Sequence, residues 1–142
     1  MKLVDLNLLI YAIDSSSPRH TAARTWLGST LSGNETVALP WAVLIGFLRL
    51  STRPSVFTNP MTSSEALDIV DGWLALPIVT VVHPGVRHTD VLRELLADLG
   101  SAGNLVSDAH LAALAIERGA ELCSCDTDFS RFSGVHWVDP LR

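Results

Sequence analysis

Lysine is nearly absent from this sequence. Lys2 is the only lysine, the other nine basic residues are arginines, and fifteen acidic residues bring the net charge to −5. A net negative charge argues weakly against a polyanionic partner. Arginine nevertheless suits bidentate phosphate contacts, although a high arginine content can also reflect genome composition. The charge balance therefore leaves binding of a phosphate-rich partner open.

Cysteine is also scarce. Cys123 and Cys125 are the only two, and their C-x-C spacing matches neither a disulfide framework nor a C-x-x-C redox motif. No second pair of cysteines completes a zinc site. On a strand this spacing places both side chains on one face, so we predict two small core residues.

Long hydrophobic runs are missing. The longest apolar run, residues 37–48, contains Pro40 and is too short to span a bilayer. In the N-terminal segment MKLVDLNLLIYAID, Asp5 and Asn7 interrupt the apolar stretch, and no small-residue cleavage site of a signal peptide is evident. We therefore expect a soluble, cytoplasmic protein without a membrane partner.

The composition is that of one folded domain. With 142 residues, 48% of them hydrophobic and 18% charged, the chain can bury a core without disulfides or a structural metal. The sequence shows no internal repeat, no low-complexity tract and no linker. We therefore predict a single domain over residues 1–142.

Strand and helix patterns alternate along the chain. Short apolar runs predict strands at 2–4, 36–39, 78–82 and 121–125, with a candidate fifth at 135–138. Helical patterns predict helices at 7–13, 18–31, 41–50, 63–75, 86–99 and 105–119. This order predicts an α/β fold, in which a four- to five-stranded, mostly parallel sheet lies between two layers of helices as an α/β/α sandwich.

Several residues mark the expected ends of the helices. Those predicted to begin a helix are Asn7, Pro18, Ser63 or Ser64, and Asn104. Gly119 is predicted to end the helix 105–119, and a turn is expected at 100–103. The segment WAVLIGFLRL, residues 41–50, is apolar on nearly every face, which predicts a buried helix.

Four aspartates are predicted to meet at one edge of the sheet. Asp5 follows the first strand, Asp126 and Asp128 follow the fourth, and Asp108 lies in the first turn of a helix. In an open parallel sheet, ligands bind outside the carboxyl ends of the strands. Each aspartate also has an ordinary structural explanation: a strand-end turn, a favourable helix dipole, an Asx-turn or an N-cap.

Converging carboxylates favour a bound cation. They repel one another, and their pKa values rise unless a cation is present. Hard oxygen ligands select Mg²⁺ or Mn²⁺. Two such ions can stabilise the attacking and leaving oxygens in phosphoryl transfer.

At these residues the chain resembles a known family. The segments that carry the resemblance are VDLNLLIYAID, LPWAVLIGFLRLSTRP, GNLVSDAHLAALAIERGAEL and SCDTDFSRF. Together they are similar to the VapC-type toxin ribonucleases, which belong to the PIN-domain family and form type II toxin–antitoxin systems. The resemblance runs from Lys2 to about Pro140.

The resemblance implies a fold, an activity and a set of residues. It implies an α/β/α sandwich with an acidic Mg²⁺ or Mn²⁺ pocket that cuts RNA, often transfer or ribosomal RNA, and inhibits translation. It implies a VapB-type antitoxin as partner, a homodimer, and a heterotetramer or higher complex with the antitoxin. The matching catalytic residues are Asp5, Asp108, Asp126 and Asp128, of which Asp5, Asp108 and Asp126 would hold the metal. Asn7 matches a residue that supports the first acid, and Ser124 one that shapes the pocket.

One position departs from the family pattern. Many PIN nucleases carry a glutamate in a pattern like A-E-F-L-R, and here the segment GFLR places Gly46 at that position. Asp90 and Glu94 are candidate substitutes on a neighbouring helix, although a solvated helix face explains them as well. A catalytically weak module that binds RNA or antitoxin therefore stays an alternative to a nuclease.

Other candidate residues carry weaker signals. Arg49 and Arg53 could hold backbone phosphates or be ordinary surface charge. The spacing of His83, His88 and His110 matches no regular ligand pattern, and His88 is predicted to pack. The tryptophans are predicted to be core rather than base-stacking residues: Trp26, Trp41, Trp73 and Trp137.

Two other enzyme classes fit the sequence poorly. A receiver domain or a haloacid-dehalogenase-type phosphatase would also place an aspartate after the first strand, but both typically need a lysine late in the chain. None follows Lys2. A dinucleotide-binding enzyme would need G-x-G-x-x-G after that strand, and DLNLLIY lacks it.

Overall fold

The centre of the molecule is a five-stranded, fully parallel sheet. The computed structural model describes residues 1–97, 99–100 and 103–142, so the predicted turn at 100–103 lies partly outside the described residues. The strands are β1 (Lys2–Val4), β2 (Val37–Ala38), β3 (Val79–Thr80), β4 (Glu121–Cys123) and β5 (His136–Val138). The predicted four to five parallel strands are confirmed, including the fifth.

The strand order creates a switch point beside β1. The order across the sheet is β3-β2-β1-β4-β5. Strands β2 and β3 therefore lie on one side of β1, and β4 and β5 lie on the other. Leu3 pairs with Leu122 and Val4 with Cys123, and all four side chains are buried. Burial on both faces explains why these central strands are apolar at successive positions. The loops after β1 and β4 therefore leave the same edge side by side.

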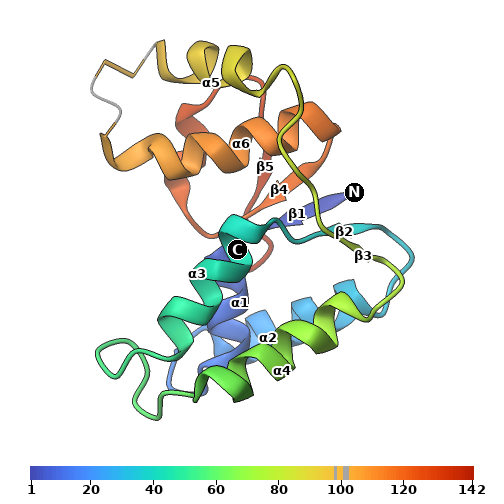
Figure 1. The fold of residues 1–142 in the computed structure, drawn as a ribbon, viewed down its shortest axis with the longest axis vertical. Helices are drawn as coiled ribbons and strands as arrows, with labels where there is room; N and C mark the ends of the chain where they lie inside the picture. Colours follow the sequence, from blue (N-terminus) through green and yellow to red (C-terminus); the bar gives the residue numbers. More distant parts are fainter. Residues whose placement is uncertain (98, 101–102) are drawn as a thin grey trace.

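In the described part of the chain, six helices flank the sheet. They are α1 (Leu6–Ile13), α2 (His20–Leu31), α3 (Trp41–Ser51), α4 (Ser63–Leu74), α5 (His88–Ala97) and α6 (Val106–Arg118). Figure 1 shows α5 and α6 together in the upper part of the view and α1 to α4 in the lower part, with the strands between them. This arrangement confirms the predicted helix–sheet–helix layers.

The structure corrects most of the predicted helix starts. Asp5, not Asn7, is the N-cap of α1, because its backbone is extended and its carboxylate accepts the Leu6 N–H. Thr62, not Ser63 or Ser64, caps α4, because Glu65 lies three residues later and completes a capping box.

The other two helix starts lack a side-chain cap. Helix α2 begins at His20 after the Arg19 N-cap, two residues beyond Pro18. Asn104 lies within a short 3-10 helix, Gly103–Leu105, and Leu105 precedes α6. By contrast, Gly119 ends α6 as predicted, with a left-handed φ of 60° that suits glycine.

The prediction that residues 41–50 form a fully buried helix is wrong in part. Val43, Leu44 and Phe47 are buried, but Trp41 is 45% exposed and Ile45 is 56% exposed. Trp41 is therefore not a core residue, while Trp73 is buried and contacts Phe47 edge-on, with 4.9 Å between ring centroids. Trp26 and Trp137 are partly buried against the core.

The fourth strand is shorter than predicted. It ends at Cys123, and Ser124 and Cys125 belong to the following loop, where the Ser124 hydroxyl donates to Asp5. Cys123 is buried, Cys125 is partly buried, and both are free thiols. Among the residues that the structure describes, no helix combines the length and the hydrophobicity required to cross a bilayer.

The packing of α3 can be tested by removing Phe47. Phe47→Ala leaves a cavity against Trp73, so we expect the free energy of unfolding to fall by about 3–5 kcal/mol. Ile45→Ala, on the exposed face of the same helix, is the matched control and should change it by about 0.5 kcal/mol or less. Urea denaturation measures both, and equal losses would contradict this orientation of α3.

Candidate acidic metal site

Asp5 occupies the end of β1 and is almost completely buried. Its backbone N–H donates to the Cys123 carbonyl of β4 at 3.0 Å. Its carboxylate accepts hydrogen bonds from the Leu6 N–H at 2.7 Å and from the Ser124 hydroxyl at 2.6 Å. These partners stabilise a charge that burial alone would penalise.

Asn7 and Ser124 connect the two loops. The Asn7 side-chain amide donates to Asp5 Oδ2 at 3.1 Å and to Ser124 Oγ at 3.0 Å, and its oxygen accepts the Cys125 N–H at 3.3 Å. Ser124 Oγ also accepts the Asp126 N–H at 3.0 Å. The predicted contact of Asn7 with Asp5 is therefore present, and the network places the Asp126 backbone next to Asp5.

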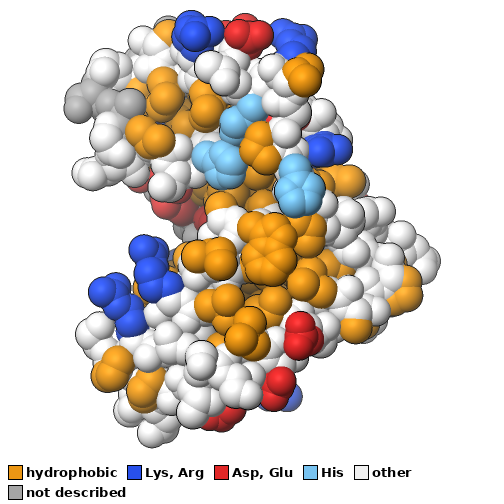
Figure 2. Space-filling model, in the orientation of Figure 1, with side chains coloured by type: hydrophobic (Ala, Val, Ile, Leu, Met, Phe, Trp, Pro, Cys, Tyr) orange, Lys and Arg blue, Asp and Glu red, His pale blue; other side chains and the backbone are white. Residues whose placement is uncertain are grey.

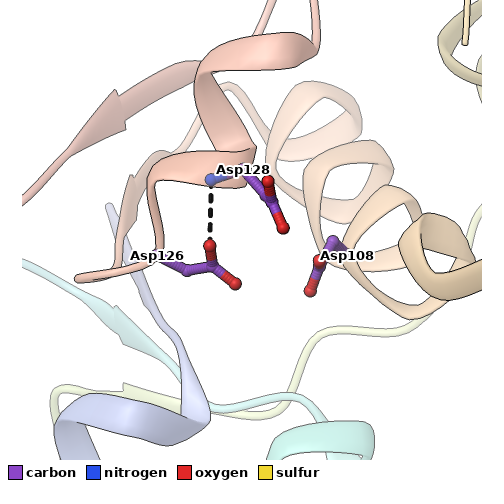
Figure 3. Close-up of side chains that lie close together, drawn as sticks. All are labelled: Asp108, Asp126 and Asp128. Atoms are coloured by element: carbon purple, nitrogen blue, oxygen red, sulfur yellow. Dashed lines mark hydrogen bonds between the residues drawn. The ribbon is translucent and has the colours of Figure 1, made fainter.

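Three aspartates approach one another directly. One carboxylate oxygen each of Asp108, Asp126 and Asp128 lies within 4.8 Å of the others. Figure 3 shows Asp108 on α6 facing the other two, which lie at the start of the 3-10 helix η2 (Thr127–Arg131). Asp126 Oδ1 accepts the Asp128 N–H at 2.9 Å, so the Asx-turn considered from the sequence is also present.

The three closest aspartates differ by one residue from the metal ligands that the resemblance implies. Asp128 joins Asp108 and Asp126 in the close group, while Asp5 lies beside it with its carboxylate held by three donors. Asp5 still acts on the group electrostatically, because it contributes to the raised pKa of Asp108. All four predicted aspartates therefore lie at one edge of the sheet.

The charges in the group oppose one another. Burial, followed by repulsion from Asp126, Asp5 and Asp128, raises the pKa of Asp108 to about 6. Burial also raises the pKa of Asp5, against the lowering effect of the Ser124 and Leu6 hydrogen bonds. An all-oxygen donor set with unfavourable mutual repulsion suits a hard divalent cation.

A cavity of about 490 Å³ opens beside these acids. Asp5 and Asp108 line it, and α3 contributes Gly46 and Arg49 to its wall. The other lining residues are Leu6, Ala42, Val43, Leu92, Val106, Ser107, His110 and Leu111. Figure 2 shows a hollow in the surface with acidic side chains inside and basic side chains on its lower rim. The cavity thus combines anionic, cationic and apolar surface.

Gly46 is in close contact with α1. A Cβ atom at this position would lie 2.6 Å from the Leu6 Cδ2 atom. The Leu6 side chain therefore occupies space next to the position where the family pattern has a glutamate. Sequence reasoning identified Gly46 but could not identify Leu6, because the two residues meet only after α1 packs against α3.

The candidate substitute acids do not join the site. Asp90 and Glu94 are exposed, and Asp90 pairs with Arg93 at 3.3 Å. Neither lines the cavity, which favours the solvated helix face. Of the two candidate phosphate-binding arginines, Arg49 lines the cavity and Arg53 does not.

Two of the three candidate histidines contact each other, which their spacing in the sequence did not predict. His88 is buried as predicted, but it contacts Glu117 and His110, and His110 lines the cavity. Burial and the neighbouring His88 lower the pKa of His110, while Glu117 acts in the opposite direction. His110 and Glu117 are seven residues apart and so share one face of α6. This spacing is a sequence signal that could have indicated that both residues contact the same neighbour.

The electrostatic cost of Asp108 can be measured without a metal. Its folded-state pKa of about 6 exceeds the ordinary value of 3.8, so the folded state binds more protons and its stability falls as the pH rises from about 4 to about 6. We expect Asp108→Asn to have a higher Tm than the wild type at pH 7.5 in chelator, with the difference shrinking at pH 4. Asp68→Asn, on the exposed face of α4, is the control, and an unchanged or lower Tm for Asp108→Asn at pH 7.5 would refute this cost.

Comparisons with known proteins agree with this geometry. The sequence model of the PIN-domain family matches residues 2–135. Ribonuclease VapC37 of Mycobacterium tuberculosis is 44% identical over 140 residues, which cover 99% of this chain and 97% of the relative. Ribonuclease VapC33 of the same species is 41% identical over 142 residues, covering 100% and 99%.

Solved structures share the fold at lower identity. VapBC2 from Rickettsia felis, bound to promoter DNA, superposes with a TM-score of 0.71 at 19% identity, covering 96% of both chains. VapC20 of Mycobacterium tuberculosis, a toxin that cleaves the sarcin-ricin loop, superposes with a TM-score of 0.70 at 20% identity, covering 96% of this chain and 98% of that one. With a family match along almost its whole length and relatives above 40% identity, this chain belongs to the PIN-domain family and, within it, to the VapC group.

Proposed function

We propose that this protein is a metal-dependent endoribonuclease and the toxin of a VapBC-type toxin–antitoxin pair. The observation that carries the proposal is the close group of Asp108, Asp126 and Asp128 beside the buried Asp5, at the switch point of the sheet. The similar relatives named as VapC ribonucleases support the same activity.

The residues fit a bound Mg²⁺ or Mn²⁺. Asp5, Asp108 and Asp126 would hold the ion directly or through water, and Asp128 is close enough to contribute. Their donors are all oxygens, which these ions prefer. The pKa of Asp108, raised to about 6 by burial and by its acidic neighbours, indicates a repulsion that a cation would relieve.

The protein residues have separate roles in this mechanism. A bound Mg²⁺ or Mn²⁺ supplies an activated water and charge stabilisation at the scissile phosphate. Ser124 and Asn7 orient the Asp5 carboxylate by direct hydrogen bonds. Arg49, on the cavity wall, holds a backbone phosphate of the RNA. The products carry 5′-phosphate and 3′-hydroxyl ends.

Similarity to the VapC group supports a substrate class and a partner. One structural neighbour is described as cutting the sarcin-ricin loop, and we propose transfer or ribosomal RNA, and hence a cytoplasmic location, for this chain. Several neighbours are VapBC complexes, and we propose a VapB-type antitoxin as the partner of a toxin homodimer. The apolar, arginine-bearing wall of the cavity is suited to a peptide that covers it.

A catalytically weak binding module is the second candidate. The observation in its favour is Gly46, which leaves the cavity one carboxylate short of the pattern in many PIN nucleases. Metal-dependent RNA binding without cleavage products would support it.

Cleavage of total bacterial RNA by the purified protein tests the proposal. We expect discrete cuts with Mg²⁺ or Mn²⁺, none with chelator, and at least a hundredfold slower cleavage by Asp126→Asn, because a carboxamide cannot replace the charge near the metal. Asp68→Asn on exposed α4 is the control and should cut at the wild-type rate. Sequencing of the fragment ends identifies the substrate, and an Asp126→Asn protein as fast as wild type would refute the site.

The role of Gly46 can be tested by restoring an acid. In Gly46→Glu alone, Leu6 obstructs the new side chain, whereas Leu6→Ala/Gly46→Glu provides room for it. We expect the double variant to bind Mn²⁺ about tenfold more tightly than wild type in calorimetry, since one more carboxylate reaches the cavity. Leu6→Ala/Gly46→Gln has the same size without the charge and should show no gain. Equal affinities for both double variants would show that this position does not reach the metal.

A further inference from the structure

A chain of three hydrogen-bonded side chains runs between α5 and α6 to the cavity. Glu117 Oε2 lies 2.7 Å from His88 Nδ1, and His88 Nε2 lies 2.9 Å from His110 Nδ1. The Glu117 and His88 side chains are only 10% and 11% exposed. His110 lies on the cavity wall, two residues after Asp108 on α6. The proposed metal chemistry uses none of these three residues.

With both imidazole rings neutral, the distances fit one arrangement of the ring protons. Glu117 only accepts: Oε1 accepts the Gly85 N–H at 3.2 Å, so Oε2 accepts from His88 Nδ1. With both rings neutral, His88 Nε2 then has a free lone pair and accepts the Nδ1–H of His110. His110 Nε2 is left as a hydrogen-bond acceptor, and no hydrogen bond within the described part of the chain uses it.

The surroundings of His110 suit a nucleotide. The cavity wall is largely apolar, and Gly46 adds no side chain to it. Arg49 can bind a phosphate, and Asp5 and Asp108 line the same cavity. A donor group of the bound nucleotide that loses water on entering this largely apolar cavity needs an acceptor. Figure 2 shows histidine side chains beside the hollow and next to exposed apolar surface.

We propose that His110, oriented by His88 and Glu117, is a specificity-determining residue whose Nε2 accepts a hydrogen bond from the RNA nucleotide held in this cavity. The donor is an O–H or N–H group of that nucleotide, either its ribose 2′-hydroxyl or a base amino group. The inference rests on the proposed ribonuclease function and names how that site selects its substrate. Sites that hydrogen-bond a substrate donor reject analogues that lack it.

Nucleotide analogues test the contact. The probe is an RNA oligonucleotide that spans the mapped cut site, with single 2′-deoxy substitutions or single bases lacking the amino group. For one of these analogues, we expect kcat/KM of the wild type to fall about tenfold relative to the parent RNA, and that of His110→Phe to fall about twofold or less. A 2′-deoxy effect identifies the ribose as the donor, and a base effect identifies the amino group.

Two further variants separate the contact from a general loss of structure. His110→Gln, which keeps an acceptor near the Nε2 position, should recover part of the discrimination. His136→Ala changes an exposed histidine outside the cavity and should discriminate as the wild type does. The inference is overturned if wild type and His110→Phe lose the same factor on every analogue. If the wild type does not cut RNA at all, it is the proposed function that fails.

The tautomer can be measured without any substrate. In ¹⁵N-labelled protein at pH 8, long-range ¹⁵N–¹H spectra should show His110 with a proton on Nδ1 and none on Nε2. Glu117→Gln removes the charge that holds the proton on His88 Nδ1, so it should lower the fraction of this tautomer and weaken the discrimination between RNA and the sensitive analogue. A protonated Nε2 in the wild type would overturn the assignment of His110 as an acceptor.

Discussion

The site depends on the contact between the end of β1 and the loop after β4. The Ser124 hydroxyl donates to the buried carboxylate of Asp5, and Asn7 bridges the same two residues. Without these donors the Asp5 charge would be buried without compensation, which costs several kcal/mol. Because Ser124 also holds the Asp126 backbone, the same contact sets where the acidic group begins.

Next to this contact, four aspartates lie close together and few basic side chains neutralise their charge. Among the described residues, Arg131 is the only basic side chain paired with the acidic group, and it lies 4.0 Å from Asp128 Oδ1. The cost falls on Asp108, whose pKa rises to about 6 through burial and the surrounding acids. Such local destabilisation is common at sites that bind a cation. The cation relieves the repulsion between the carboxylates, and this relief strengthens its binding.

The cavity next to the acids is shaped by α3 and α6. Gly46 lines it in contact with Leu6, at the position where the pattern of many PIN nucleases has a glutamate, and His110 also lines it. Both features change what can occupy the space beside the metal site without altering the acids themselves. Within a family that shares one fold and one chemistry, differences of this kind can separate one substrate from another.

Much of this protein was determined by its sequence alone. Alternating apolar runs and helical patterns predicted the parallel sheet between two helix layers, and the positions of Asp5, Asp108, Asp126 and Asp128 predicted an acidic edge. Local patterns are sufficient for the strands and helices, because periodicity and helix turns extend over only a few residues. The acidic edge then follows because ligands bind outside the carboxyl ends of parallel strands.

Only the tertiary structure decided which groups touch. Asp5 and Ser124 are 119 positions apart, and they meet because β4 pairs with β1 rather than with another strand. Local patterns do not specify strand order, so they could not show that Asp128 joins the closest group. Nor could they show that Leu6 covers Gly46, since that contact requires α1 to pack against α3. Two of the predicted helix starts, Asn7 and Ser63 or Ser64, were wrong for a related reason. A side chain caps a helix only when the backbone of the same residue is extended, as it is at Asp5 and Thr62.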